Sequence, residues 1–326
     1  MKRILVTGGT GFIGSNLSLR LVEAGYSVRI LRREKSDLRT IRGTDVEQFV
    51  GDVRDLESVR RAVAGCDTVF HTAAVVTFVR KMRELQQEVI VSGTSNVVEA
   101  CLAEGVGKLI VTSSIAAIGH PSEGELATEE TPFNWPRTTG YKFSKYQAER
   151  HVLDAAGRGL TAVIVNPSVV IGERDIHFHG GELVKEARQG RLLFYPEGGM
   201  NVVYVGDVVN GHILAAHKGL SGQRYILGGH NMTHQEVFRR TAALVGARRP
   251  LMKLPTSLLR FGARVIEAAG NLTGIDPPVS SDLVAGAGLH NWYSSEKAQR
   301  ELGYTITPFD TMIIAAYRWY QENGLL

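Results

Sequence analysis

Cysteine, long apolar runs and a strong charge excess are all scarce in this sequence, and each scarcity excludes a class of protein. Only two cysteines, Cys66 and Cys101, occur in 326 residues, too few for a disulfide framework and typical of reduced thiols in a cytoplasmic protein. No apolar run reaches the length of a membrane span, and the short one after the basic start stops at Gly8, which argues against a secretory leader. The Lys and Arg behind the net charge of +4 are spread along the chain, without the basic stripe typical of nucleic-acid binding.

The first half of the chain alternates short β-branched runs with longer helical patterns. This alternation of strand and helix patterns predicts an α/β fold with a parallel, doubly wound sheet of the Rossmann type. The expected strands are residues 4–7, 27–31, 47–50, 68–71, 108–112 and 161–166. The expected helices are residues 15–24, 56–64, 85–104 and 141–156.

The alternation of strand and helix patterns becomes less regular after about Pro167, where loops rich in Gly, His and Pro appear. The helical patterns beyond it are residues 233–245, 256–269, 295–302 and 309–323. We therefore predict a dinucleotide-binding domain over residues 1–167 and a smaller, more helical substrate-binding lobe over residues 168–326, interleaved with the last elements of the sheet. Such a lobe would close over the carboxyl ends of the strands, where ligands bind in this architecture.

A glycine-rich turn joins the first predicted strand to the first predicted helix. Gly9-x-Gly11-x-x-Gly14 fits the dinucleotide-binding fingerprint, and the frame Gly8-x-x-Gly11-x-x-Gly14 is equally compatible. In both frames the glycines allow a tight turn and a close approach of the backbone to a pyrophosphate at the positive end of a helix. The strand before the motif and the helix after it favour this interpretation over a plain tight turn.

A second signal lies on the last predicted helix of the first half. Tyr141 and Lys145 are four residues apart and so share a helix face, with Cβ atoms about 5–6 Å apart. An ammonium group beside a phenol favours the phenolate, and the lowered pKa suits Tyr141 to acid/base work. Ser113 and Ser114 follow a predicted strand, where a hydroxyl could hold a substrate oxygen beside the Tyr oxygen. The spacing alone is equally compatible with surface packing, but its order after the glycine turn and the serines favours chemistry.

With these motifs the chain resembles the extended short-chain dehydrogenase/reductase family over nearly its whole length. Within that family it looks most like the branch of dihydroflavonol 4-reductase and 3β-hydroxysteroid dehydrogenase. The resemblance implies an NAD(P)-dependent enzyme that acts on CH–OH or C=O groups. The segments that carry it are Thr7 to Gly14, Gly51-Asp52-Val53, His71-Thr72-Ala73-Ala74, Thr112-Ser113-Ser114, Tyr141-x-x-x-Lys145, Asn166-Pro167-Ser168 and Trp292 to Ala298.

The resemblance also implies a role for each matching position. Tyr141 would be the acid/base, Ser114 the catalytic serine beside it, and Lys145 the group that lowers the pKa of Tyr141 and binds the nicotinamide ribose. Asp52 and Val53 would meet the adenine, although Asp52 could instead cap the helix that follows. The expected cofactor-binding residues are Gly8, Thr10, Gly11, Phe12, Ile13, Gly14, Arg32, Arg33, Asp52, Val53, Ala73, Ala74, Ser113, Tyr141, Lys145, Pro167 and Ser168.

Two positions depart from the family pattern. A common pattern has Asn three residues before the Gly of a Gly-Thr pair, but Ile90 stands there, before Gly93, so a water relay to the lysine must be built otherwise. At the end of the second strand, where NAD enzymes often place an acid, the chain has Arg32 and Arg33. Guanidinium groups suit a 2′-phosphate, so we predict NADP(H), with NAD(H) as the alternative if the arginines form only a solvated basic turn.

Four further polar residues are assigned no catalytic or metal-binding role. His177 and His179 lack partner ligands at metal spacing, so we expect a flexible substrate loop and no metal site. Asp207 is expected to cap a helix that begins near it. His71 is expected to be a structural histidine at a strand end.

These observations predict an NADP-dependent oxidoreductase that interconverts a ketone or aldehyde and an alcohol. Apolar stretches at residues 251–269 and 279–289 favour an apolar or aromatic substrate, although core packing also explains them. Only Arg174, Arg188 and Arg191 are candidates to clamp a nucleotide diphosphate, and none is clearly placed to do so.

Two other functions stay open at this point. One is a nucleotide-sugar epimerase or dehydratase that uses tightly bound NAD(P). The other is a non-catalytic NADP-sensing binder, which the presence of both the Tyr and the Lys disfavours. We expect a small-molecule substrate, no nucleic-acid partner and no membrane span, and we leave a homodimer open.

Overall fold

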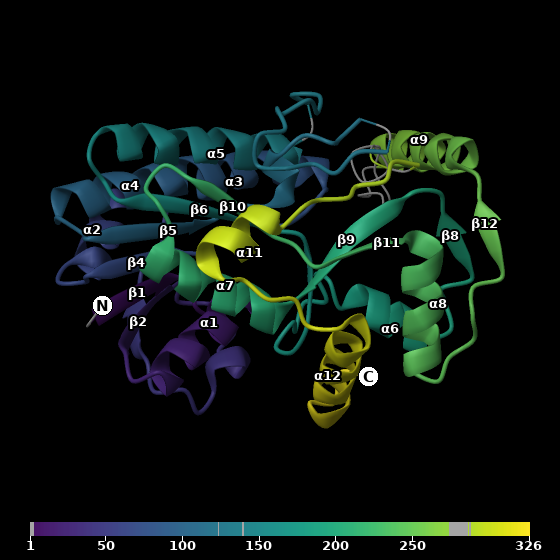
Figure 1. The fold of residues 1–326 in the computed structure, drawn as a ribbon, viewed down its shortest axis with the longest axis horizontal. Coiled ribbons are helices and arrows are strands. Elements are labelled where there is room, and N and C mark those ends of the chain that lie inside the picture. The colour runs from purple at the N-terminus through teal and green to yellow at the C-terminus, as the bar shows by residue number, and fades with distance from the viewer. Residues whose placement is uncertain (1–2, 123, 139, 274–285, 287) are drawn as a thin grey trace.

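A larger α/β domain and a smaller lobe beside it make up the described part of the chain (Figure 1). The computed structural model describes residues 3–122, 124–138, 140–273, 286 and 288–326, so most of the predicted apolar stretch at 279–289 lies outside the described residues. Over the described ranges, no helix is long and apolar enough to cross a membrane.

Seven parallel strands form the central sheet, in the order β10-β6-β5-β4-β1-β2-β3. They are β1 (Arg3–Thr7), β2 (Ser27–Arg32), β3 (Glu47–Val50), β4 (Thr68–His71), β5 (Lys108–Thr112), β6 (Ala162–Pro167) and β10 (Arg224–Leu227). Six of these strands match the predicted ones to within one residue at each end. The seventh strand, β10, comes from the second half of the chain and pairs with β6 at the sheet edge.

Helices cover both faces of this sheet, which confirms the predicted doubly wound fold (Figure 1). Ile4 and Val6 of β1 pack into one apolar layer and Leu5 into the other, because side chains alternate along a strand. The helices on the Ile4 side are α1 (Phe12–Glu23), α7 (Val205–Lys218) and α11 (Glu296–Leu302). The helices on the Leu5 side include α2 (Leu56–Val63), α4 (Gly93–Ala103) and α5 (Gly140–Gly157).

The helix predicted over residues 85–104 is present, but it is not a regular α-helix throughout. It consists of α3 (Arg83–Gln86), a π-helical turn η3 (Gln87–Ser92) and α4. Within this stretch the hydroxyl of Thr94 donates to the carbonyl oxygen of Ile90 at 2.5 Å. Side-chain hydroxyls that bond back to the preceding turn disturb regular helical bonding, and π-turns of this kind often lie near functional sites.

The smaller lobe contains two short sheets and four helices among the described residues. One sheet has the order β11-β9-β7, and β12 pairs with β8 in the other. These strands, which the sequence pattern did not reveal, are β7 (Val169–Ile171), β8 (Phe194–Pro196), β9 (Gly199–Tyr204), β11 (His230–Thr233) and β12 (Met252–Leu254). The helices are α6 (Glu182–Arg188), α8 (His234–Leu244), α9 (Thr256–Thr273) and α12 (Phe309–Glu322). Short 3₁₀ turns occur at η1 (Arg39–Ile41), η2 (Arg80–Met82) and η4 (Ile115–Ala117).

Asp207 does not cap α7, so that prediction is wrong. Tyr204 is the N-cap residue of α7, and its side chain makes no capping hydrogen bond. The buried Asp207 carboxylate instead accepts hydrogen bonds from the backbone N–H of Thr307 at 2.7 Å and from its hydroxyl at 2.6 Å. Asp207 therefore ties the segment before α12 to the larger domain.

Candidate active site

The glycine turn between β1 and α1 forms a cradle at the carboxyl end of the sheet. Gly8 has a φ of +68°, and a Cβ there would lie 2.8 Å from the Cα of Ala73. A Cβ on Gly14 would overlap the carbonyl oxygen of Gly8. Gly11 is the N-cap of α1 and brings no side-chain hydrogen bond, so the first N–H groups of the helix stay available to an anion. The residues present therefore fit a pyrophosphate.

A cavity of about 600 Å³ extends from this cradle toward the smaller lobe. Ten of the predicted cofactor-binding residues line it: Gly8, Gly11, Phe12, Ile13, Gly14, Ala74, Ser113, Tyr141, Pro167 and Ser168. Thr10 lies behind the turn, where its carbonyl oxygen accepts a hydrogen bond from Thr40, and Ala73 packs against Gly8. The buried hydroxyl of Ser168 has no partner among the described residues, as expected for a group that binds a ligand.

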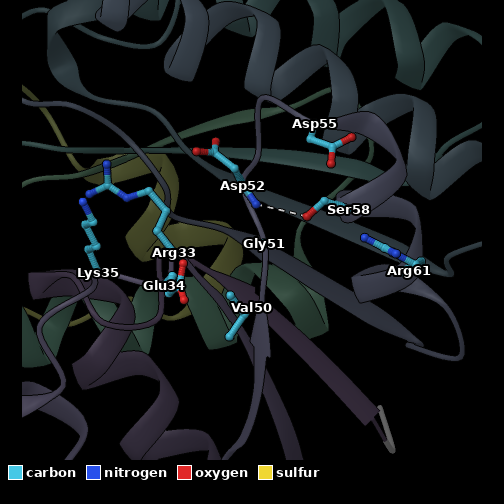
Figure 2. A pocket seen from close by; sticks show the side chains of 9 residues that line it. All are labelled: Arg33, Glu34, Lys35, Val50, Gly51, Asp52, Asp55, Ser58 and Arg61. Atoms are coloured by element: carbon cyan, nitrogen blue, oxygen red, sulfur yellow. Dashed lines mark hydrogen bonds between the residues drawn. The ribbon is translucent and has the colours of Figure 1, made fainter.

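A second cavity, of about 500 Å³, lies beyond the ends of β2 and β3 and is lined mainly by charged side chains. Figure 2 shows Arg33 and Lys35 on one side of it and Ser58 and Arg61 on the other. Arg32 does not line this cavity, because its guanidinium donates to the side chain of Gln48 at 2.8 Å and to the carbonyl oxygen of Arg33 at 3.1 Å. Of the two predicted arginines, the fold brings only Arg33 to the cavity.

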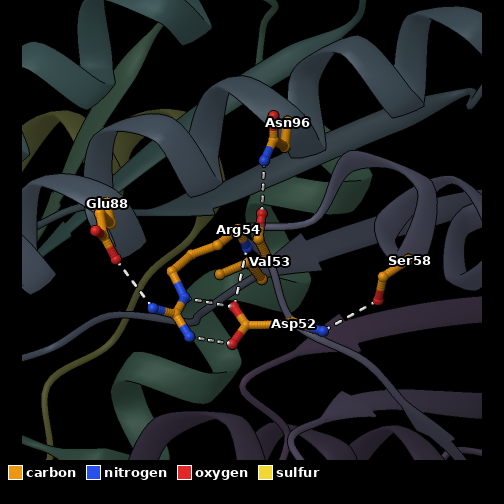
Figure 3. Close-up of polar contacts among 6 residues, drawn as sticks. All are labelled: Asp52, Val53, Arg54, Ser58, Glu88 and Asn96. Atoms are coloured by element: carbon orange, nitrogen blue, oxygen red, sulfur yellow. Dashed lines mark hydrogen bonds and ion pairs between the residues drawn. The ribbon is translucent and has the colours of Figure 1, made fainter.

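Asp52 lines the same cavity and does not cap a helix. Its carboxylate accepts hydrogen bonds from the backbone and the guanidinium of Arg54, both at 2.9 Å, and Arg54 also pairs with Glu88 (Figure 3). The Arg54 guanidinium lowers the pKa of Asp52. The cap of α2 is Asp55, which accepts from the N–H of Glu57 at 3.1 Å, so the alternative role considered for Asp52 is wrong.

Val53 takes a different position from its neighbour. Its side chain is buried in the core, close to Gly93, where a Cβ would lie 2.9 Å from it. Asn96 of α4 donates to the carbonyl oxygen of Val53 at 2.9 Å (Figure 3). The loop after β3 is thus held to α4, which fixes Asp52 at the cavity.

Ser114 and Tyr141 meet at the wall of the larger cavity. Ser114 follows β5, and its hydroxyl accepts from the N–H of Ala116 at 3.1 Å and hydrogen-bonds the Tyr141 hydroxyl. Surrounding protein raises the pKa of Tyr141 to about 12, since it disfavours the phenolate, and the Ser114 contact acts in the opposite direction. At neutral pH the Tyr141 hydroxyl is therefore protonated.

Lys145 lies one helical turn beyond Tyr141, with its side chain buried. Its ammonium donates to the carbonyl oxygen of Thr112 at 2.7 Å. Burial lowers the pKa of Lys145 to about 8, while the negative charge of Glu149 raises it. The expected lowering of the Tyr141 pKa by Lys145 does not occur in this structure, where burial dominates and the ammonium is engaged by the backbone.

Glu149 is a buried group that the sequence reasoning missed. Its carboxylate accepts a hydrogen bond from Asn166 at 2.6 Å and pairs with Arg224 at 3.3 Å. Asn166 also donates to the carbonyl oxygen of Ser114 at 2.9 Å, so the network reaches the loop after β5. The spacing Lys145-x-x-x-Glu149, which puts both charges on one helix face, was the signal available in the sequence.

His71 lies beneath the cradle as a structural residue. Its two ring nitrogens hydrogen-bond Thr7 at 2.7 Å and Thr94 at 3.0 Å. Burial, together with the charge of Lys145, lowers the pKa of His71 to about 3, so the ring stays neutral. Ile90, at the position of the family asparagine, is buried in the π-helical turn.

A buried carboxylate holds the loop after β7, for which we predicted a flexible substrate loop. Asp175 accepts hydrogen bonds from three consecutive backbone N–H groups, those of His179, Gly180 and Gly181, at 2.9 to 3.0 Å. His179 lines the large cavity, whereas His177 does not. The described residues contain no group of three His, Cys, Asp or Glu side chains arranged to hold a metal ion.

Apolar side chains from both lobes complete the large cavity. They include Val76, Phe78, Ile115, Trp135, Val169, Val170, Met200 and Leu259. No arginine stands among the described residues that line it. Arg174 is turned to the carbonyl oxygen of Thr40, Arg191 pairs with Glu186, and Arg188 lines a separate hollow.

The doubly wound sheet, with its glycine cradle and its serine–tyrosine pair, is that of the extended short-chain dehydrogenases/reductases, which are NAD(P)-dependent oxidoreductases. More narrowly, residues 5–231 match the model of the 3-beta hydroxysteroid dehydrogenase/isomerase family, and the chain belongs to this family.

Individual relatives agree with this assignment. A Synechocystis sp. protein named "Putative dihydroflavonol 4-reductase" is 34% identical to this chain, with 98% of this chain and 94% of the relative covered. The 2-alkyl-3-oxoalkanoate reductase of Stenotrophomonas maltophilia is 32% identical, with 93% and 94% covered. The crystal structure of gox2253 is 36% identical and superimposes with a TM-score of 0.88 over 100% of both chains. UDP-glucose 4-epimerase from Thermus thermophilus, solved with NAD, is 28% identical, with a TM-score of 0.76 and coverage of 98% and 99%. The family and the branch predicted from the motifs are thus confirmed.

Proposed function

We propose that this protein is an NADP(H)-dependent reductase that interconverts an apolar ketone or aldehyde and the corresponding alcohol, with Tyr141 as the acid/base. The observation that carries the proposal is the position of the Ser114–Tyr141 hydroxyl pair in the wall of a cavity that is otherwise mostly apolar. A polar pair in an apolar surrounding orients a carbonyl group and excludes competing water.

The bound nicotinamide would supply or accept the hydride. Ser114 and Tyr141 would hold the carbonyl oxygen by hydrogen bonds, and Tyr141 would give that oxygen its proton as hydride reaches the carbon. Lys145, whose Nζ donates a hydrogen bond to the carbonyl oxygen of Thr112, would place a positive charge near the ribose that carries the nicotinamide. Asn166 would keep the Ser114 backbone in place through its 2.9 Å hydrogen bond.

The preference for NADP(H) rests on the end of β2. Arg33 and Lys35 line the charged cavity there, and no acid occupies the last position of the strand, which is Arg32. A forked guanidinium and an ammonium suit the 2′-phosphate of NADP, whereas NAD enzymes use a carboxylate for the free 2′-hydroxyl. Asp52 is already paired with Arg54, so it competes little for the phosphate-binding cations.

The preference for a carbonyl substrate over a sugar nucleotide rests on the lining of the large cavity. A nucleotide diphosphate carries charges that arginines usually bind, and none of the three arginines that the sequence offered lines this cavity. The lining therefore supports the reductase over the epimerase.

A screen of NADPH oxidation with carbonyl compounds, apolar cyclic and long-chain ketones first, tests the proposal. We expect turnover with apolar ketones, stoichiometric alcohol formation, and tighter binding of NADPH than NADH in a fluorescence titration. Conversion of UDP-glucose without net cofactor turnover would instead establish an epimerase. Tight NADPH binding with no turnover on any carbonyl would establish a sensor.

A further inference from the structure

Apolar side chains gather at one edge of the smaller lobe, outside the site described above. Eight of the fourteen large apolar side chains that are exposed among the described residues lie on or directly beside β8, β12 and α9. Figure 1 places α9 and β12 at the end of the molecule opposite the N-terminus. We call these three elements, with the residues that adjoin them, the distal edge.

Four of the eight side chains stand on or beside the two-stranded sheet. Phe194 of β8 and Met252 of β12 are direct partners in the parallel pair, so their exposed side chains point to the same face. Leu251 donates its N–H to the carbonyl oxygen of Leu193 at 2.8 Å and leaves 74% of its own side chain exposed. Two strands that offer an apolar face to water are unusual unless something covers that face.

The other four side chains belong to α9. Leu258, Phe261 and Val265 are spaced three and four residues apart, which puts them on one side of the helix, and Phe261 is 66% exposed. The opposite side packs inward, where Ala263 is buried and Leu259 lines the large cavity. The fourth exposed side chain, Ile266, is 40% exposed and lies about one helical turn after Ala263.

Positive charge borders this apolar surface. Arg260 and Arg264 are four residues apart on the flank of α9, about a quarter turn from Phe261 and Val265. Residues 248–267 hold five of the 37 Lys and Arg of the chain and one of its 33 Asp and Glu. This stretch therefore carries +4, which equals the net charge of the whole chain, and the rest of the chain is balanced.

We propose that the distal edge is a docking surface for an anionic lipid membrane. Apolar side chains on one side of a helix, with arginines on its flank, can enter the headgroup boundary while the guanidinium groups reach lipid phosphates. A second copy of this chain fits less well, because it would bring the same positive charge to the contact. Glu197 pairs with Lys253 at 2.7 Å and accepts from Thr256 at 2.9 Å, which joins the sheet to the start of α9 as one surface.

Docking in this way would also place the large cavity at the bilayer. Leu259 of α9 and Pro196 of β8 line that cavity, so elements of the distal edge form part of its wall. An apolar substrate could then pass from the lipid to the Ser114–Tyr141 pair with little exposure to water. This consequence rests on the proposed function, but the docking itself does not.

Sedimentation of the full-length protein with vesicles tests the docking. We expect binding to vesicles of phosphatidylcholine mixed with phosphatidylglycerol, little binding to phosphatidylcholine alone, and weaker binding as salt rises. The double variant Met252→Ser/Phe261→Ser should lower the bound fraction about tenfold, and Arg260→Gln/Arg264→Gln should remove most of the salt dependence. Circular dichroism and NADPH titration check that each variant is folded.

Leu220→Ser is the matched apolar control, since Leu220 is 63% exposed but lies between α7 and β10 on the larger domain. It should bind vesicles as the unchanged protein does. The proposal is overturned if the unchanged protein stays unbound with the anionic vesicles at low salt, or if Leu220→Ser loses binding equally. It is also overturned if the unchanged protein binds no vesicles but forms an oligomer that Met252→Ser/Phe261→Ser dissociates. Vesicle binding without any carbonyl turnover would keep the docking surface and contradict only the proposed function.

Discussion

The two cavities along the carboxyl ends of the strands differ in the kind of side chain that lines them. The cavity beyond β2 and β3 is built from exposed charges such as Arg33 and Lys35, whereas the cavity at the glycine turn is mostly apolar around Ser114 and Tyr141. Behind the apolar cavity lie buried ionisable groups, with Lys145 the nearest to the site. On the proposed function, the exposed charges would select the cofactor and the buried charges would tune the chemistry.

The largest effect should come from the apolar cavity. Tyr141→Phe removes the proton donor but keeps the ring, so we expect kcat to fall about 10³-fold, within the range that general acids contribute. The Kd of NADPH should change less than about twofold, because the phosphate cradle and the charged cavity are untouched. Steady-state kinetics and a fluorescence titration measure the two quantities.

Tyr146→Phe is the matched control for that variant. Tyr146 lies on the same helix and stacks on Phe133, with ring centroids 4.5 Å apart, and it does not line either cavity. It should keep nearly full activity. Substantial turnover by Tyr141→Phe would show that another group supplies the proton.

The next effect should come from the charged cavity. Arg33→Gln should raise the Kd of NADPH about tenfold, or about 1.4 kcal/mol, and leave the Kd of NADH nearly unchanged, since only NADPH carries the 2′-phosphate. Arg32→Gln is the comparison, because Arg32 is engaged by Gln48 and should have the smaller effect. Equal losses for both nucleotides would contradict the assignment of this cavity to the 2′-phosphate.

A third change should move a pH profile rather than a rate. The charge of Glu149 raises the pKa of Lys145, which burial has lowered to about 8. Glu149→Gln should therefore lower the pKa of Lys145 further, so that the ammonium loses its proton sooner and the basic limb of kcat/KM shifts down by about 1 pH unit. Asp154→Asn, on the exposed part of the same helix, should leave the profile in place. An unmoved limb would mean that Lys145 does not set it.

The last effect concerns the pH dependence of folding stability and not catalysis or cofactor binding. Burial lowers the pKa of His71 to about 3 and that of His212 to about 4, both from 6.5. Below pH 6.5 the unfolded chain binds protons that the folded chain does not, so the free energy of unfolding should fall as pH drops from 6.5 toward 4, by about 1 kcal/mol per pH unit for each histidine. Urea unfolding across this range measures the slope, and His71→Gln should make it shallower. A slope that His71→Gln leaves unchanged would assign the acid sensitivity to other groups.

Local pattern was enough to predict the parts of the fold that neighbouring residues in the chain build. Strands β1, β4, β5 and β6 have apolar sequences because both of their faces are buried, and the cradle could be recognised because its glycines are close together in the chain. The helix from residue 85 was predicted in place, but its π-helical turn was not, because the spacing of apolar residues does not distinguish a π-turn from a regular helical turn.

Only some residues of the candidate site could be predicted from the sequence. Tyr141 and Lys145 are recognisable by their spacing, whereas Asn166 and Arg224 reach Glu149 from distant strands and carry no local signal. The same limit explains why the sequence could not show which of Arg32 and Arg33 lines the charged cavity. They are adjacent and chemically equal in the sequence, and the fold engages Arg32 with Gln48 of β3 and with the carbonyl oxygen of Arg33, while Arg33 lines the cavity.

The sequence by itself determined the doubly wound sheet, the glycine cradle and the serine, tyrosine and lysine of the site, because periodicity and short spacings record contacts between residues close in the chain. The tertiary structure alone decided that β10 joins the sheet, that Asn166 and Arg224 reach the buried carboxylate of Glu149, and that eight exposed apolar side chains share one edge with the excess positive charge. Those are contacts between segments far apart in the chain, and burial, which sets the pKa values and exposes the distal edge, exists only once these segments have packed.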